Sequence, residues 1–254
     1  MPESAGHEKP SPEPTARSVE EICGLLLEGD LGECELIPWG SNYTFAVPMS
    51  ANGGASFLAI YKPREGEAPL WDFPRGTLYR REVAAFLTSE ALGWGIVPPT
   101  VVRAGPHGVG SLQLYVEPDE EVDYAALQER HADMLRRCAL FDMVINNADR
   151  KAGHCFLGRD GRVWAIDHGL TFHAQPKLRT VIWDFRDEPV PPPWLQDIRA
   201  FRDRLEAREE IAESLEKLLD PAEIRALKMR IEDILADPVY PSPRHHRHFP
   251  WPPY

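Results

Sequence analysis

Short apolar segments separated by turn residues dominate the first half of the chain. Residues 34–40 (CELIPWG), 41–49 (SNYTFAVPM) and 55–63 (ASFLAIYKP) are rich in β-branched and aromatic side chains. Two similar runs follow at 97–105 and 110–118. Runs of this length between turn residues are typical of short strands. The pattern therefore predicts a small antiparallel sheet.

Helical spacing alternates with these runs and then replaces them. Ser18 precedes VEEICGLLLEG as a typical N-cap, and Gly29 follows as the stop. Residues 77–92 place their apolar side chains near one face, and from 122 to 145 apolar residues recur every three or four positions. The last helix is predicted after Asp220, where Pro and Glu complete a capping pattern. A β-rich part is thus followed by an α-rich part, which predicts an α+β fold.

Composition narrows the class of protein. The 254 residues carry a formal net charge of −12, and no basic face stands out. Nucleic acids and anionic bilayers attract basic surfaces, so neither is an expected partner. No run approaches the roughly 20 apolar residues that span a bilayer, and the four cysteines show no CxxC spacing. We expect a cytoplasmic protein with no stable membrane association.

The sharpest local pattern is a hairpin between CFLG and RVWAID. Asp160 and Gly161 between these runs are a strong two-residue turn signal. With these two as the turn, facing residues have numbers that sum to 321, and His154 lies opposite Asp167. Directly opposed side chains are about 5 Å apart at Cβ, which suits a shared divalent ion. The pattern predicts a metal-binding pair.

Asp149 follows the predicted long helix in the polar run Asn146 to Lys151. A carboxylate beside a metal pair can orient an attacking hydroxyl, because phosphoryl transfer depends on positioning and charge neutralisation. The alternative for each aspartate is a structural turn or cap. Three coordinated positions favour the chemical interpretation.

The segment from 149 to 169 resembles the catalytic and metal-binding loops of the phosphatidylinositol 3- and 4-kinase-like superfamily. It also resembles an actinobacterial group of proteins of this length, which shares the histidine described next. The superfamily pattern is an Asp, an Asn five positions later, and an Asp-x-Gly after a short hairpin. The resemblance implies a catalytic role for Asp149 and metal binding by Asp167. His154 stands where the superfamily has asparagine, which leaves open a preference for Mn²⁺ over Mg²⁺ or a weakened site.

The same resemblance extends, more loosely, to the first half. Lys62 at the end of an apolar strand matches the residue that contacts ATP phosphates, and Glu82 matches its acidic partner. The turn containing Ser41 and Asn42 corresponds to a phosphate-covering turn, with a plain hairpin as the alternative. The strand 112–118 occupies the place of the hinge that holds adenine, and its candidate residues are Tyr115 and Val116.

The resemblance implies a two-lobed kinase-like fold with a small antiparallel β-rich N-lobe and a mainly helical C-lobe. We expect a disordered leader at 1–18, the N-lobe with its nucleotide-binding sheet and helix at 19–117, and the C-lobe with the catalytic and metal loops at 118–237. Residues 238–254 form a tail rich in proline, histidine and aromatic residues, which we expect to be docked on the surface.

The leading hypothesis is an ATP-dependent kinase that uses Mg²⁺ or Mn²⁺. Its acceptor is open, with a soluble small molecule or a protein favoured over a lipid. A second hypothesis is a kinase-like module that binds nucleotide with little or no phosphotransfer. A third is a metal-dependent hydrolase that uses His154, Asp167, His168 and His173, although these lack the usual HExxH spacing.

Overall fold

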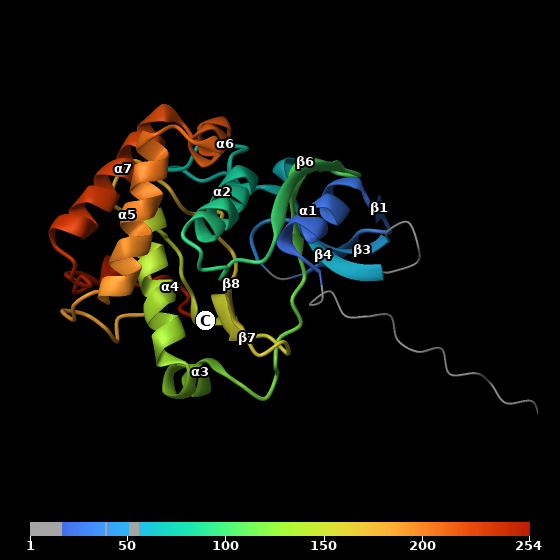
Figure 1. Ribbon diagram of the computed structural model, residues 1–254. Coiled ribbons are helices and arrows are strands. Elements are labelled where there is room, and N and C mark those ends of the chain that lie inside the picture. The colour runs from blue at the N-terminus through green and yellow to red at the C-terminus, as the bar shows by residue number, and fades with distance from the viewer. Residues whose placement is uncertain (1–16, 39, 51–55) are drawn as a thin grey trace, which may run out of the picture.

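The computed structural model describes residues 17–38, 40–50 and 56–254. It is an α+β fold, as predicted, with a curled antiparallel sheet on one side and a group of helices on the other (Figure 1). The predicted leader falls almost wholly on residues 1–16, outside the described residues. The predicted boundaries between lobes and tail stay predictions.

The N-lobe sheet is antiparallel, with strand order β1-β3-β4-β6-β5, and β2 also pairs with β3. β4 lies near the middle, where Ile60 faces Gln113 of β6 and Ala46 of β3. Strand β6 ends at residue 114, earlier than predicted, so Tyr115 and Val116 lie in the connection that follows. The strands are β1 (Asp30–Leu31), β2 (Glu35–Ile37), β3 (Thr44–Ser50), β4 (Ser56–Pro63), β5 (Thr100–Gly105) and β6 (Gly108–Leu114).

Two helices accompany the sheet, and both were predicted. α1 (Val19–Glu28) begins at a capping box in which Ser18 and Glu21 bond to each other's backbone N–H groups. α2 (Leu78–Ala91) lies between the sheet and the helical lobe (Figure 1). Most of its side chains are buried, including charged ones, because it is covered from both sides.

The C-lobe consists of five α-helices and a two-stranded sheet. The single long helix predicted before Asn146 is wrong, because the chain leaves the helical conformation at His131 and begins a second helix there. The apolar spacing continues across this break, so the pattern does not register it. The elements are α3 (Tyr124–Arg130), α4 (Ala132–Ile145), β7 (Cys155–Leu157), β8 (Val163–Ala165), α5 (Pro192–Glu206), α6 (Glu210–Leu218) and α7 (Pro221–Ala236).

The hairpin β7–β8 is present, but its predicted register is wrong by one residue. Phe156 faces Trp164, so facing numbers sum to 320. The loop has three residues instead of two, because the Gly161 N–H bonds to the Gly158 carbonyl and Gly161 adopts φ +77°. A turn followed by a left-handed glycine is the usual three-residue hairpin loop. His154 therefore lies opposite Ile166, whose N–H it accepts at 3.0 Å.

Among the described residues, two large apolar cores and one small one hold the fold together. The main core joins the C-lobe helices to α2, and a second core lies between α1 and the sheet. The small cluster of Phe73, Leu78 and Ala148 lies under the connection between β4 and α2. None of the helices in the described ranges has the length and apolar character needed to cross a bilayer.

Candidate active site

A cleft of about 530 Å³ lies between the sheet and the C-lobe. Strand β4, helix α2, the connection after β6 and the loops around β7 and β8 all contribute to its walls. All the residues proposed for the kinase hypothesis line this one cleft: Ser41, Asn42, Lys62, Glu82, Tyr115, Val116, Asp149, His154 and Asp167. Their chemical roles stay predictions.

Lys62 joins three separate elements inside the cleft. Its Nζ lies 2.5 Å from Glu82 Oε1 on α2 and 3.0 Å from Asp167 Oδ1 just after β8. The side chain of Lys62 points inward from the end of β4, where residues alternate between the two faces. One ammonium group therefore connects the sheet, the helix and the loop after the hairpin.

These contacts favour the charged forms of Lys62 and Asp167. Burial lowers the pKa of Lys62, but the carboxylates of Asp167 and Glu82 outweigh it and leave the pKa raised. The Lys62 ammonium holds the pKa of Asp167 far below its ordinary value, against the opposing effect of burial. The cleft thus contains a cation that can bind phosphate and an ionised carboxylate that can bind metal.

Helix α2 is fixed to the C-lobe by buried polar contacts. Glu82 Oε2 accepts the His168 N–H at 2.8 Å. Next to it, Arg81 lies 2.5 Å from Glu223 of α7 and donates to the Thr171 carbonyl at 2.6 Å. Arg81 is 1% exposed, so water competes little for these bonds. The orientation of Glu82 toward Lys62 is therefore set from both sides.

Asp149 lies at the edge of the cleft, after the left-handed C-cap Asn146 of α4 (φ 53°). Its N–H donates to Asn147 Oδ1 at 3.0 Å, and its carboxylate lies 3.2 Å from Lys151 Nζ. Burial raises the pKa of Asp149, and Lys151 partly opposes that shift. The raised pKa brings the carboxyl closer to the range of a general base.

Arg150 holds the loop of Asp149 against the β7–β8 hairpin, and sequence reasoning missed it. It is fully buried and forms a bidentate ion pair with Asp142 of α4, at 2.8 Å. Its Nη1 donates to the Ile166 carbonyl at 2.9 Å, and its Nη2 donates to His168 Nε2 at 2.8 Å. The available signal was Asp142 itself, a charged residue at an apolar position of a helix.

His154 and Asp167 approach each other despite the register change. His154 Nε2 lies 3.2 Å from Asp167 Oδ2. Asp167 has φ +60°, so it does not follow the strand alternation that would otherwise put the two side chains on opposite faces. Burial lowers the pKa of His154 to about 4, so its imidazole is neutral and can act as a ligand. A neutral imidazole with a carboxylate suits Mn²⁺ better than Mg²⁺.

The turn that contains Ser41 and Asn42 is hydrogen-bonded to the segment that follows β4. Asn42 Oδ1 accepts the Ala68 N–H at 2.7 Å, and the Tyr43 N–H donates to the Gly66 carbonyl at 2.9 Å. Gly40 adopts φ +99°, which glycine tolerates without strain. At the other end of the cleft, the Tyr115 N–H donates to the Leu58 carbonyl at 2.9 Å. Val116 follows it on the connection between the lobes.

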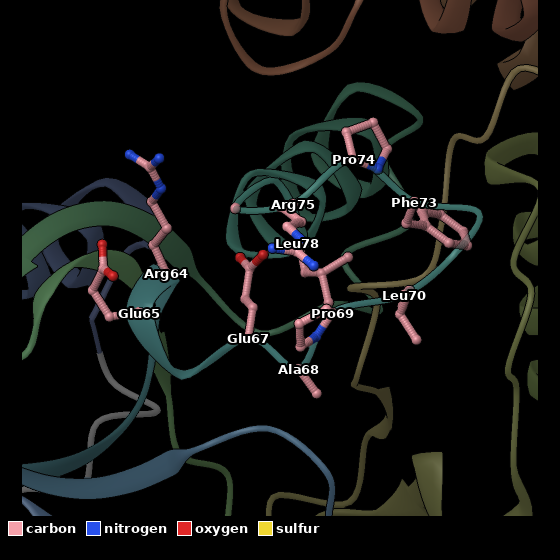
Figure 2. Close-up of a pocket in the computed structure, with 11 residues that line it drawn as sticks. Arg64, Glu65, Glu67, Ala68, Pro69, Leu70, Phe73, Pro74, Arg75 and Leu78 are labelled. Atoms are coloured by element: carbon pink, nitrogen blue, oxygen red, sulfur yellow. The ribbon is translucent and has the colours of Figure 1, made fainter.

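A smaller cavity of about 250 Å³ adjoins the cleft and shares Glu67 and Leu78 with it. Arg64 lies at one end and Phe73 at the other (Figure 2). Glu67 Oε1 accepts the Tyr79 N–H at 3.0 Å, at the start of α2, where a carboxylate complements the helix dipole. A groove of about 660 Å³ lies on the other side of the connection after β6.

His168 and His173 do not join His154 and Asp167. The His168 ring is fully buried and its Nε2 faces Arg150, while His173 Nε2 faces the Asp72 carbonyl at 2.9 Å. Among the residues that the structure describes, no group of three or more His, Cys, Asp or Glu is arranged to hold a metal ion. The four-residue set of the hydrolase hypothesis is therefore not assembled.

Comparison with known sequences finds two relatives. The Mycobacterium tuberculosis protein Rv2133c is 41% identical over 263 residues, which cover 90% of this chain and 94% of that protein. Phosphatidylinositol 4-kinase gamma 4 of Oryza sativa subsp. japonica is 28% identical over 203 residues, covering 65% of this chain and 35% of the relative. No protein-family model matches the chain.

Solved structures, among them two kinases, share the fold at low sequence identity. The Golgi casein kinase with Mn/ADP bound superposes with a TM-score of 0.59 at 17% identity, over 86% of this chain and 74% of that one. Hydra Fam20 with sugar gives 0.54 at 14% identity, over 86% and 88%. The Helicobacter pylori proinflammatory kinase CtkA gives 0.52 at 11% identity, over 85% and 94%. These likenesses show a kinase-like fold.

Proposed function

The chain belongs to the same family as the Mycobacterium tuberculosis protein Rv2133c, and we propose that it is an ATP-dependent phosphotransferase. The observation that carries the proposal is the contact of Lys62 with both Glu82 and Asp167, in a cleft that also contains Asp149. Phosphoryl transfer needs a cation for the phosphates, a carboxylate for metal and a group that orients the attacking hydroxyl. The kinase-like fold supports the same conclusion.

Each residue has a role in this proposal. Lys62 binds the phosphates of ATP, Glu82 orients Lys62, and Asp149 orients or deprotonates the acceptor hydroxyl. Tyr115 and Val116 contact adenine, and the turn of Ser41 and Asn42 covers the phosphates. Asp167 and His154 would hold a divalent ion, Mn²⁺ or Mg²⁺, whose charge neutralises the phosphate oxygens when bound. We propose a hydroxyl of a small molecule or a protein as the acceptor, because the net charge of −12 disfavours anionic lipid surfaces.

A direct test follows ADP formation and nucleotide binding with purified protein, ATP and either Mn²⁺ or Mg²⁺. Asp149→Ala should retain nucleotide binding and lose turnover, because Asp149 acts on the acceptor. Asp203→Ala removes an exposed aspartate of α5 outside the cleft and should change neither quantity. Absence of nucleotide binding with both metals contradicts the proposal.

The second candidate is a nucleotide-binding protein without phosphotransfer. The observation that favours it is His154, a histidine where the resembling superfamily has asparagine, close to Asp167 at 3.2 Å. Under this alternative the protein binds ATP, and Asp149→Ala leaves the slow background rate of ADP formation unchanged. The variant His154→Asn separates the two candidates. A gain of turnover in this variant shows that the histidine prevents phosphotransfer in the original protein, as the second candidate states.

A further inference from the structure

The end of the chain lies against the loop that carries Asp149. In Figure 1 the C-terminus is in the middle of the molecule, next to β7. Pro253 O accepts the Ala152 N–H at 2.9 Å. Ala152 begins the short 3₁₀ turn that ends at His154, and its N–H has no partner within that turn. The chain end therefore satisfies a backbone donor of the active-site loop.

A second contact joins the tail to the segment around Thr180, which pairs with the same loop. His248 O accepts the Thr180 N–H at 3.0 Å. The segment around Thr180 pairs with the loop, because the Arg150 N–H donates to the Arg179 carbonyl at 3.0 Å and the Val181 N–H donates to the Arg150 carbonyl at 3.1 Å. The tail is thus bonded directly to residue 152 and, through residues 179–181, to residue 150; these two flank Lys151.

Side-chain packing fixes the tail in this place. The Trp183 ring stacks on His248, with centroids 6.1 Å apart, and also contacts Phe249 at 6.1 Å. Three prolines at 250, 252 and 253 restrict the backbone, so few further backbone torsions lose their freedom when the tail docks. None of residues 238–254 lines the cleft itself. The tail is connected to the cleft residues through the loop.

We propose that residues 248–254 are a positioning element for phosphotransfer. They keep Lys151 beside Asp149 and His154 beside Asp167, through the backbone bonds at Thr180 and Ala152. The inference rests on the proposed function, because positioning matters only if Asp149 and His154 take part in the reaction. A displacement of about 1 Å at a reacting group can reduce a rate about 100-fold, so small loop movements have measurable effects.

The test compares two variants of the full-length protein. A stop codon in place of Pro253 removes Pro253 and Tyr254, and with them the carbonyl that binds Ala152. Tyr254→Ala is the matched control, because Tyr254 is 84% exposed and its replacement keeps that carbonyl. The truncated protein should show a kcat lower by about tenfold or more, with the Kd for ATP changed less than about twofold. The control should match the original protein.

Hydrogen exchange of residues 150–155 gives a readout that does not need turnover. The Ala152 amide should exchange faster in the truncated protein and not in Tyr254→Ala. If the truncated variant fails to fold, Phe249→Ala loosens the same tail and should accelerate the same amide. Unchanged exchange and unchanged kcat overturn the inference and leave the proposed function standing. Failure of the original protein to form ADP overturns the proposed function, and the exchange experiment still decides whether the tail holds the loop.

Discussion

Replacement of Asp142 by asparagine tests the buried ion pair beneath the active site. Asp142 and Arg150 are each 0% exposed, and their charged atoms lie 2.8 Å apart. Asparagine keeps the size of the side chain but removes its charge, so the Arg150 guanidinium remains buried without a counter-ion. Removing one partner of a buried pair destabilises a protein by about 3–5 kcal/mol. The other acceptors of Arg150 are uncharged and cannot replace the carboxylate.

This loss is large compared with the stability of an ordinary domain, about 5–15 kcal/mol. For a domain of this size each kcal/mol lowers the melting temperature by about 2–4 °C, so the expected decrease is roughly 6–20 °C. Urea unfolding followed by fluorescence measures the free energy, and a thermal melt checks it. The control Glu216→Gln breaks an exposed pair with Arg208 and should change stability by less than about 1 kcal/mol.

A double replacement, Asp142→Leu with Arg150→Met, separates stability from function. Well-packed apolar side chains often replace a buried pair without loss, so most of the stability should return. Turnover should not return, because Arg150 Nη1 also holds the Ile166 carbonyl beside Asp167. A decrease below about 1 kcal/mol for Asp142→Asn contradicts the reasoning. So does full turnover in the double variant.

Replacements at Arg81 and Gly161 and the ionisation of Asp149 give three further tests. Arg81→Met leaves Glu223 buried without its partner and should lower the urea midpoint of unfolding. The affinity for ATP should fall as well, because Arg81 holds helix α2, which carries Glu82 beside Lys62. An unchanged midpoint contradicts this prediction. Gly161→Ala should lower the free energy of unfolding by about 1–2 kcal/mol, measured in a thermal melt, because Gly161 has φ +77° and alanine is strained there. No atom of the described residues lies close enough to clash with the added methyl group, so the backbone conformation alone causes the loss. A neutral effect would refute the left-handed conformation of Gly161. Asp149 must be ionised to act as a base, and its pKa is raised above the ordinary aspartate value near 3.8. As the pH is lowered, kcat/KM should therefore begin to fall at a pH above 3.8. A fall that begins only at or below that pH contradicts the prediction.

Local signals allowed much of the fold to be predicted. Ser18 and Asp220 each form a capping box with a residue three positions later, so the sequence around them is sufficient to place α1 and α7. The strands before and after α2 follow from turn residues and apolar runs. The break at His131 was missed because apolar side chains continue at helical spacing on both sides of it.

The hairpin shows how a correct local signal can give a wrong register. Asp160–Gly161 signals a turn, but the two- and three-residue loops differ only in which residue takes the left-handed conformation. The predicted proximity of His154 and Asp167 rested on the wrong register. The two side chains meet because Asp167 itself is left-handed, a property that its own sequence neighbourhood does not specify.

Other parts of the site depend on contacts that no local pattern specifies. Arg150 pairs with Asp142 across the end of a helix, and Arg81 reaches Glu223 over 142 positions. The carbonyl of Pro253 meets the N–H of Ala152 over a separation of about 100 residues. No periodicity or motif reports such pairs, since they arise from packing of the whole chain.

The most direct test of the nucleotide cleft is a crystal structure of the protein with a non-hydrolysable ATP analogue and Mn²⁺. We expect the phosphates at Lys62, the metal at Asp167 and His154, and adenine against Tyr115 and Val116. Nucleotide bound in the groove on the other side of the connection after β6, with the cleft empty, would contradict the account.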